Sequence, residues 1–195
     1  MPAQQGPLLV VVSGPSGSGK STICRRLVEK NGYTLSVSAT TRSPRPGEQD
    51  GRDYRFVSRS EFLDGVARGE FMESSEHFGN LYGTPRGPVE QALAAGKVVV
   101  LEIDVNGARQ VRRHAAGAMK VLSVFVNAPS FDELRRRIMQ RPGTQDEAVA
   151  RERLARARTE LAERGAFDAE VVNDVMDDAV ARVEELIGTE AAENG

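Results

Sequence analysis

The sequence is poor in cysteine, histidine and aromatic residues. Its 195 residues include one cysteine, Cys24, two histidines and no tryptophan, and aromatic residues make up 5% of the chain. A single cysteine excludes an internal disulfide and any zinc site built from several cysteines. We interpret Cys24 as a small buried residue and expect the chain in a reducing, cytoplasmic compartment.

The sequence also lacks an excess of one charge and any long apolar segment. Its 26 basic and 28 acidic residues give a formal net charge of −2. This balance provides no general attraction to nucleic acid or to a membrane surface, so we expect neither as a partner. The apolar runs at 8–12 and 98–101 are too short to span a bilayer, and residues 1–7 do not have the pattern of a secretory signal.

An alternation of strand and helix patterns predicts an α/β fold. The β-branched run at 8–12 is typical of a strand buried on both faces of a parallel sheet, and a helix follows over 20–31, which Gly32 ends. Ser130 with Glu133, and Thr144 with Glu147, have the spacing of helix caps. Such repeated units favour a parallel sheet covered by helices on both faces. We predict further strands at 34–38, 97–103, 121–126 and up to 172, and helices at 89–95, 106–115, 130–141, 144–164 and 177–187.

Residues 39–88 interrupt this alternation with a different composition. Prolines and glycines cluster at 43–51, Ser58 and Glu61 predict a capped helix through residue 68, and Gly79-Asn80 suits a tight turn. We interpret this segment as an inserted subdomain within a single-domain chain. The predicted boundaries are a core of 8–38, 89–134 and 155–188, an insert of 39–88, a lid of about 135–154, and flexible ends at 1–7 and 189–195.

The strongest motif is a phosphate-binding loop. Residues 14–21 read GPSGSGKS and match the P-loop pattern G-x-x-x-x-G-K-[ST] in full. Its glycines let backbone N–H groups point at phosphate oxygens, while Lys20 reaches the β- and γ-phosphates and Ser21 ligates Mg²⁺. A chance glycine-rich loop is the alternative, but the position between a buried strand and a helix disfavours it. The predicted ATP-binding residues are Gly14, Pro15, Ser16, Gly17, Ser18, Gly19, Lys20, Ser21 and Thr22.

Two further elements complete the predicted nucleotide site. Asp104 directly follows a strand, where a carboxylate of the Walker-B type holds the metal, usually through water; a simple turn residue is the alternative. Arginines that close over the transferring phosphoryl group stabilise its charge, although some of them are expected to lie on solvated helix faces. These arginines flank Pro142-Gly143-Thr144 and are Arg135, Arg136, Arg137, Arg141, Arg151 and Arg153.

A second phosphate site is predicted in the insert. Arg42 and Arg45 lie three residues apart in a proline-stiffened loop, with serine hydroxyls before them and Tyr54 after them. Arginine forks match phosphate oxygens, and hydroxyl groups add further donors. A polar surface loop is the alternative on physical grounds alone.

This stretch, SVSATTRSPRPGE followed by GRDYRF, closely resembles the GMP-binding signature of guanylate kinases, and the resemblance runs in order over residues 8–187. The resemblance implies a P-loop NTPase three-layer α/β fold with a parallel sheet, an inserted mixed α+β GMP-binding subdomain and a short lid. It also implies Mg²⁺-dependent transfer of the ATP γ-phosphoryl group to GMP or dGMP, which yields ADP and GDP or dGDP in purine nucleotide metabolism. ATP and GMP are then the small-molecule partners. The sequence does not give the oligomeric state.

The resemblance also assigns individual residues. Around the GMP phosphate it places Ser38, Arg42, Arg45, Tyr54 and Tyr82. Around the guanine it places Glu73, the Gly83-Thr84 pair and Glu102, with Asp104 near both the metal and the GMP site. It implies a catalytic set of Lys20, Arg42, Arg137, Arg141 and Arg153, with Asn173 beside the adenine. His77 and His114 match no catalytic position.

The chemistry of guanine agrees with this assignment. Guanine presents N1–H and an N2 amine side by side, and one carboxylate such as that of Glu73 can accept both, whereas adenine has an acceptor at N1. Three other functions fit these residues less well. A non-catalytic interaction domain would have lost P-loop or lid residues, a sugar-phosphate kinase would lack Glu73, Thr84 and Glu102, and a regulatory GTPase needs an N-K-x-D motif that is absent.

Overall fold

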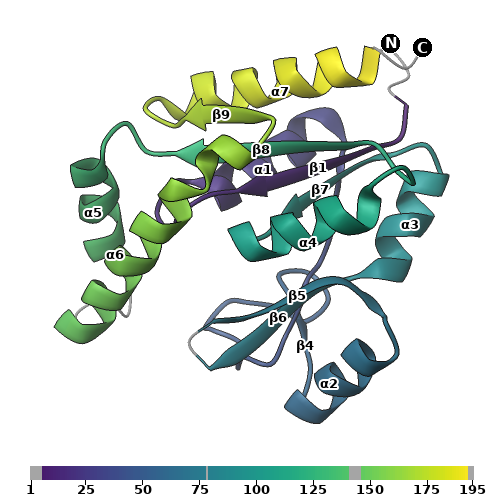
Figure 1. Cartoon of the computed structure of the whole chain (residues 1–195), viewed down its shortest axis with the longest axis horizontal. Helices are drawn as coiled ribbons and strands as arrows, with labels where there is room; N and C mark the ends of the chain where they lie inside the picture. The colour runs from purple at the N-terminus through teal and green to yellow at the C-terminus, as the bar shows by residue number, and fades with distance from the viewer. Residues whose placement is uncertain (1–5, 78, 141–145, 193–195) are drawn as a thin grey trace.

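The main sheet has five parallel strands. The computed structural model describes residues 6–77, 79–140 and 146–192, and its larger sheet has the strand order β2-β7-β1-β8-β9 (Figure 1). All four strand pairs are parallel, with Val10 opposite both Val100 and Leu122. The strands are β1 (Leu8–Ser13), β2 (Thr34–Leu35), β7 (Val98–Glu102), β8 (Val121–Asn127) and β9 (Ala169–Val172).

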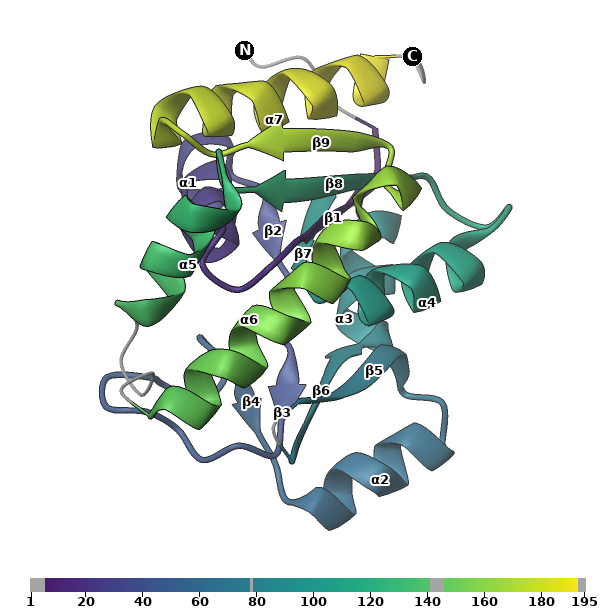
Figure 2. The same cartoon turned by 60° about the vertical axis from the view of Figure 1, so that its left-hand side comes forward.

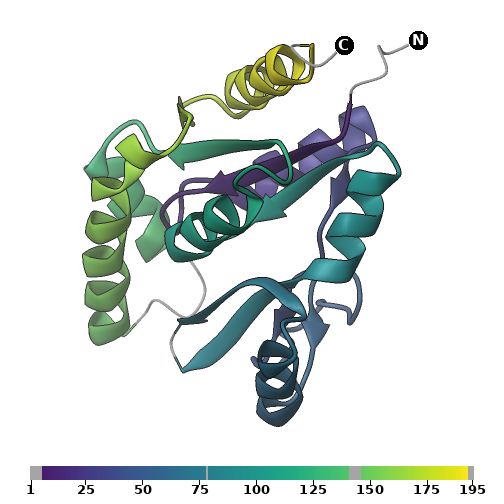
Figure 3. The same cartoon turned by 45° about the vertical axis from the view of Figure 1, so that its right-hand side comes forward.

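Helices cover both faces of this sheet. Even-numbered β1 residues such as Val10 pack against α1 (Lys20–Asn31) and α7 (Met176–Ala192). Odd-numbered residues such as Val11 pack toward α3 (Arg86–Ala94) and α4 (Val105–Ala115). Figures 1 and 3 show α7 and α4 on opposite sides of the strands. The predicted three-layer α/β fold is confirmed.

A smaller sheet forms the predicted mixed insert. Its strand order is β4-β3-β6-β5, with β3 parallel to β4 and antiparallel to β6. Its helix begins with the predicted capping box of Ser58 and Glu61, and Phe62 of that helix stacks on Phe71 with ring centroids 4.5 Å apart. The elements are β3 (Ala39–Thr40), β4 (Arg55–Phe56), α2 (Arg59–Ala67), β5 (Phe71–His77) and β6 (Asn80–Pro85).

Two helices form an arm beside the main sheet. Helix α5 (Phe131–Met139) and helix α6 (Glu147–Ala162) share a small buried cluster that contains Leu134, Ile138 and Ala157, and the turn η1 (Arg164–Ala166) follows α6. Figure 2 shows α6 running from the main sheet toward the insert. This course brings side chains of α6 to the space between the two sheets.

Several element ends differ from the predictions. Strand β2 stops at Leu35 instead of residue 38 because the chain then leaves the sheet edge for the insert. Helix α3 begins at Arg86, three residues before the predicted start, and α5 ends at Met139 instead of residue 141. Helix α6 is capped by Asp146, whose side chain accepts from Ala148 N at 2.7 Å; the predicted cap, Thr144, lies outside the described residues.

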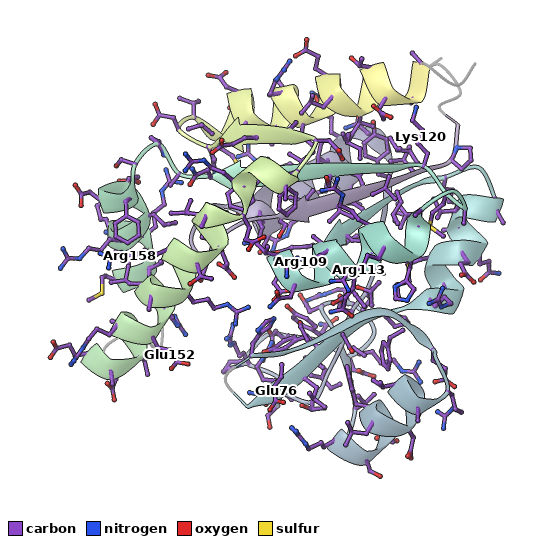
Figure 4. All side chains as sticks on the ribbon, viewed as in Figure 1. Glu76, Arg109, Arg113, Lys120, Glu152 and Arg158 are labelled. Carbon is purple, nitrogen blue, oxygen red and sulfur yellow. The ribbon has the colours of Figure 1, made fainter. Side chains whose placement is uncertain are left out.

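The C-terminal segment is more ordered than predicted. Helix α7 continues to Ala192, so residues 189–192 belong to the helix and not to a flexible end. Lys120 Nζ donates to Glu190 O at 2.6 Å, and Ala191 is buried (Figure 4 shows Lys120 near this end of α7). The other boundaries of core, insert and lid stay predictions. Within the described residues, no helix has both the length and the apolar character needed to cross a membrane.

Candidate active site

The phosphate loop fits tightly between β1, β8 and α1. Gly14 and Gly19 have φ angles of 135° and 97°, in the region that side chains disfavour. A Cβ atom at Gly14 would lie 2.1 Å from Val126 O, and one at Gly19 would lie 2.1 Å from Asn173 Nδ2. Both glycines are therefore required by space as well as by backbone conformation.

Lys20 lies folded over this loop. Its Nζ atom donates to Gly14 O at 2.6 Å and to Pro15 O at 2.9 Å, which holds the charge at the loop. Ser16 and Lys20 both line a cavity of about 390 Å³, whereas Thr22 is exposed on α1. The contact of Lys20 with a bound phosphate chain stays a prediction.

Asn173 contacts the loop and not an open base pocket. Its side chain is only 2% exposed, and Nδ2 donates to Ser18 O at 2.7 Å. Arg137 Nη1 donates to Asn173 O at 3.1 Å, and Arg137 Nε donates to Glu133 Oε1 at 2.7 Å. Asn173 therefore makes a structural contact with the loop and its contact with adenine stays a prediction, while Arg137 lies next to the same loop.

The carboxylate beside Ser21 is that of Glu102. Ser21 Oγ donates to Glu102 Oε1 at 2.5 Å, across 81 residues of sequence. Asp104, predicted for this place, instead contacts His77 and Arg156 on the insert side of the cavity. Strand β7 ends at Glu102, and Asp104 lies beyond it as the N-cap of α4, so the two acidic residues have different neighbours. The ligand contacts predicted for Glu102 at the base and for Asp104 near both the metal and the GMP site stay predictions, while the structure places Glu102 and not Asp104 against Ser21.

The predicted acceptor phosphate site is built around Arg42. Its guanidinium donates to both carboxylate oxygens of Glu48 at 2.9 Å and lies 5.3 Å from the centroid of the Tyr54 ring. The hydrogen bonds that Arg42 donates to Glu48 raise the pKa of Arg42 further, so its charge is permanent. Burial raises the pKa of Tyr54 to about 12, with a further contribution from Glu102, so its phenol stays protonated and can donate.

Glu48 was not predicted. Besides binding Arg42, its Oε2 atom accepts from Arg45 N at 2.7 Å, so one carboxylate fixes both ends of the Arg42–Arg45 turn. The signal available in the sequence was an acid three residues after Arg45 in a loop rich in arginine. Ser38, Arg45 and Tyr82 line the same cavity as Arg42.

Glu73 is a buried acid on the wall of the cavity. It is 4% exposed, and Thr84 Oγ1 donates to its Oε1 atom at 2.7 Å. Burial raises the pKa of Glu73 to about 7; the Thr84 hydroxyl opposes this shift, and the charge of Asp104 adds to it. Thr84 is fully buried and its hydroxyl donates to Glu73, so in this structure it orients that carboxylate; the hydrogen bond from Thr84 to a base stays a prediction.

Gly83 has a packing role in the insert. A Cβ atom at this position would lie 2.9 Å from both the Phe62 and the Phe71 rings, so glycine lets β6 approach them. Gly83 is buried and does not line the cavity. The residue predicted by resemblance to be part of the GMP site therefore supports β6, which carries Thr84.

Asp104 caps α4 and faces Glu73. Its Oδ1 atom accepts from Gly107 N at 2.7 Å. A Cβ atom on Gly107 would lie 2.5 Å from Glu73 Oε2 and 3.2 Å from Asp104 Oδ1, so the two carboxylates converge over this glycine. Burial opposes the charged form of Asp104, but hydrogen bonds from His77 and Gly107 and the charge of Arg156 outweigh it and lower the pKa of Asp104.

A single cavity of about 390 Å³ brings these groups together. Most of the predicted residues that line it come from the phosphate loop, the insert and the end of β7: Gly14, Ser16, Lys20, Ser38, Arg42, Arg45, Tyr54, Glu73, Tyr82, Glu102 and Asp104. Arg153 reaches it from α6, and Arg141 lies outside the described residues.

The cavity also contains residues that sequence reasoning missed. Ser75 and His77 follow Glu73 at alternate positions on β5, so they share its face of the strand. Arg156 follows Arg153 by three residues on α6, and such positions are neighbours on a helix. Both periodicities were available in the sequence once the strand and the helix were assigned.

A phosphate loop and an arginine–tyrosine anion site that face one cavity define a P-loop kinase for small phosphorylated acceptors. The family model described as guanylate kinase matches residues 7–190, and the chain belongs to the guanylate kinase family.

Relatives and a solved structure agree with this placement. The chain is 51% identical to a guanylate kinase of Parasynechococcus marenigrum over 92% of this chain and 97% of the relative. It is 51% identical to one of Gloeobacter violaceus over 92% of this chain and 86% of the relative. A crystal structure of guanylate kinase from Anaplasma phagocytophilum superposes with a TM-score of 0.78 at 34% identity, covering 96% of this chain and 87% of that chain.

Proposed function

We propose that this protein transfers the γ-phosphoryl group of ATP to GMP or dGMP with Mg²⁺, giving ADP and GDP or dGDP. The observation that carries the proposal is the single cavity in which Lys20 of the phosphate loop and the buried acid Glu73 face the same space. The loop supplies a place for a nucleotide triphosphate, and the acid supplies an acceptor for guanine donors. Family membership supports both halves.

The donor side would hold ATP through loop N–H groups and Lys20. A hydroxyl and a carboxylate oxygen are ligands that Mg²⁺ prefers, and Ser21 with Glu102 offers both within 2.5 Å of each other. When bound, Mg²⁺ neutralises charge on the β- and γ-phosphates.

The acceptor phosphate would bind between Arg42, Arg45 and the hydroxyls of Ser38, Tyr54 and Tyr82. Glu48 holds Arg42 in place before the acceptor arrives, so little ordering is needed on binding. A phosphate oxygen of GMP is the nucleophile and is already ionised. The reaction therefore needs no histidine base, and catalysis rests on positioning and on charge.

The base would be read by Glu73 and Asp104. Glu73 Oε2 and Asp104 Oδ1 converge over Gly107, where each has an acceptor site for N1–H or the N2 amine of guanine. Adenine would place its N1 lone pair against a carboxylate, which is repulsive. Thr84 keeps Glu73 in this orientation through its 2.7 Å hydrogen bond.

Two described arginines are suited to the charge of the transferring phosphoryl group. Arg137 lies beside the phosphate loop, and Arg153 lines the cavity from α6. Arg141 remains a predicted third member outside the described residues. Cations brought to the equatorial oxygens would stabilise the transition state more than the ground state.

An acceptor screen tests this function. Purified protein with Mg·ATP is given GMP, dGMP, AMP, IMP, CMP and UMP, and ADP formation and product identity are measured. GMP and dGMP should be phosphorylated efficiently and AMP poorly, and EDTA should stop turnover. Binding of GMP without any ADP formation would overturn the proposal in favour of an interaction domain.

A further inference from the structure

Arg156 joins the helical arm to the predicted base pocket. Its Nη2 atom donates to Asp104 Oδ2 at 3.0 Å, and its Nε atom donates to Glu160 Oε1 at 3.0 Å. Glu160 is 9% exposed and lies one turn further along α6. The guanidinium is thus held by its own helix and directed across the cavity at a carboxylate that follows β7.

His77 contacts the same carboxylate oxygen from the insert. Its Nε2 atom lies 2.7 Å from Asp104 Oδ2 and 3.1 Å from Arg156 Nη2. An unprotonated Nε2 would oppose a carboxylate oxygen at that distance, so we assign the hydrogen to Nε2 as the donor. Asp104 Oδ2 then accepts hydrogen bonds from two residues that lie on different elements.

These contacts leave Asp104 with one direction for a ligand. A carboxylate has about four acceptor sites, two on each oxygen. Arg156 and His77 fill those of Oδ2, and Gly107 N fills one of Oδ1. Within the described part of the chain, the remaining acceptor site is on Oδ1, the oxygen that converges with Glu73 Oε2 over Gly107.

We propose that Arg156, assisted by His77, is a positioning residue that determines selectivity for the N2 amine of the acceptor base. By filling Oδ2 it orients Asp104 so that Oδ1 stands beside Glu73 Oε2. A guanine that gives N1–H to Glu73 directs its adjacent N2 amine to Asp104 Oδ1. The inference rests on the proposed function and extends it to a residue on the helical arm.

A purely structural role for Arg156 makes a different prediction. If the arginine only fastens α6 to the insert, its loss affects every acceptor alike and lowers stability. If it orients Asp104, its loss affects an acceptor that has the N2 amine and spares one that lacks it. Hypoxanthine differs from guanine in the absence of this amine, so IMP is the matched probe.

The experiment compares GMP and IMP in wild type, Arg156→Met, Arg156→Lys and Arg158→Met. Arg158 is the control because it is on the same helix, and its guanidinium lies 4.9 Å from the Phe131 ring of α5; Figure 4 shows it beside α5. Dissociation constants without ATP come from calorimetry, and kcat and KM are measured at saturating Mg·ATP. Thermal melting shows whether each variant is folded.

Arg156→Met should lower kcat/KM for GMP by about tenfold, mainly through KM, because an orienting charged hydrogen bond is lost. IMP should change by less than about twofold, and the KM for ATP should not change. Arg156→Lys should recover part of the loss, since an ammonium still donates but lacks the planar fork. Arg158→Met should match wild type, and His77→Val should shift the GMP-to-IMP ratio in the same direction as Arg156→Met.

Equal losses for GMP and IMP in Arg156→Met, or no loss for either, would overturn the inference. If Arg156→Met fails to fold, the ratio in folded His77→Val decides, and an unchanged ratio counts against it. The wild-type protein tests the proposed function separately, because that function is refuted if wild type does not phosphorylate GMP. If wild type does phosphorylate GMP but the GMP-to-IMP ratio is unchanged in the variants, only the role of Arg156 is refuted.

Discussion

The two halves of the cavity are built in different ways. The donor half is mostly backbone: a contiguous loop curls around the place for phosphates, and Lys20 returns to the loop's own carbonyl groups. The acceptor half is made of side chains from separate elements, with Glu73 on β5, Asp104 after β7 and Arg156 on α6. A site built from backbone groups depends on one loop conformation, whereas the specificity of a site built from side chains can change by substitution of one residue at a time.

The largest effect is expected on the donor side. Lys20→Ala removes a charge at the phosphates and leaves the buried core intact, so it should lower kcat by roughly a hundredfold or more, at least ~3 kcal/mol. Affinity for GMP alone should not change, since the acceptor half is separate. Steady-state kinetics and GMP calorimetry check this. Near-normal turnover in Lys20→Ala would contradict the assignment of residues 14–21 as the ATP phosphate-binding loop.

Substitution on the acceptor side should change the preference for GMP over AMP. Glu73→Gln keeps the Thr84 contact through its amide oxygen but puts an NH₂ group where guanine has a donor. kcat/KM for GMP should fall roughly tenfold to a few hundredfold, while the KM for ATP barely changes. Kinetics with GMP and AMP at saturating Mg·ATP test it. If the GMP-to-AMP ratio is unchanged, Glu73 does not read the base and Asp104 becomes the main candidate.

Substitution of Asn173 tests whether the phosphate loop needs support from outside the loop to bind ATP. Asn173→Ala leaves the buried Ser18 O without its 2.7 Å donor, and an unsatisfied buried group costs about 1–3 kcal/mol. The KM for ATP should therefore rise by about tenfold, with GMP affinity unchanged. Asn173→Asp, which replaces the donor by an acceptor of equal size, should be worse. An unaltered KM for ATP in both variants would show that the loop keeps its conformation without Asn173.

The smallest effect concerns pH and the stability of the nucleotide-free protein. Because the folded pKa of Glu73 is raised to about 7, it stabilises the fold at low pH, and this contribution is lost as pH rises through that value. Wild type should lose about 1 kcal/mol relative to Glu73→Gln between about pH 6 and pH 8. Urea unfolding at both pH values measures the difference. Parallel pH profiles would mean that Glu73 is already charged at pH 6.

The donor half could be predicted almost completely because its determinants are local. The glycine spacing, the buried strand before it and the helix from Lys20 to Asn31 all appear in one stretch of sequence, and the structure has the same helix bounds. The sequence did not reveal that a residue distant in the chain supports the phosphate loop. Asn173 was assigned to the adenine, but its side chain lies under the loop, a contact that joins residues 155 positions apart.

The acceptor half could be predicted only as a set of residues. Glu73, Thr84, Glu102 and Asp104 all lie where the two sheets meet, but the contacts of Glu102 with Ser21 and of Thr84 with Glu73 could not be read from the sequence. Two residues of spacing at a strand end do not reveal which acid faces the phosphate loop. Arg156 and His77 are absent from the predicted site because their positions beside Arg153 and Glu73 follow only after the helix and the strand have been assigned.

The sequence by itself determined the phosphate loop, the three-layer fold and the family, because each follows from local pattern or from order along the chain. Only the tertiary structure decided which oxygen of Asp104 is left for a ligand, since that depends on donors from α4, β5 and α6 meeting at one carboxylate. Hydrogen bonding is directional and short in range, so such roles exist only after distant elements have packed together.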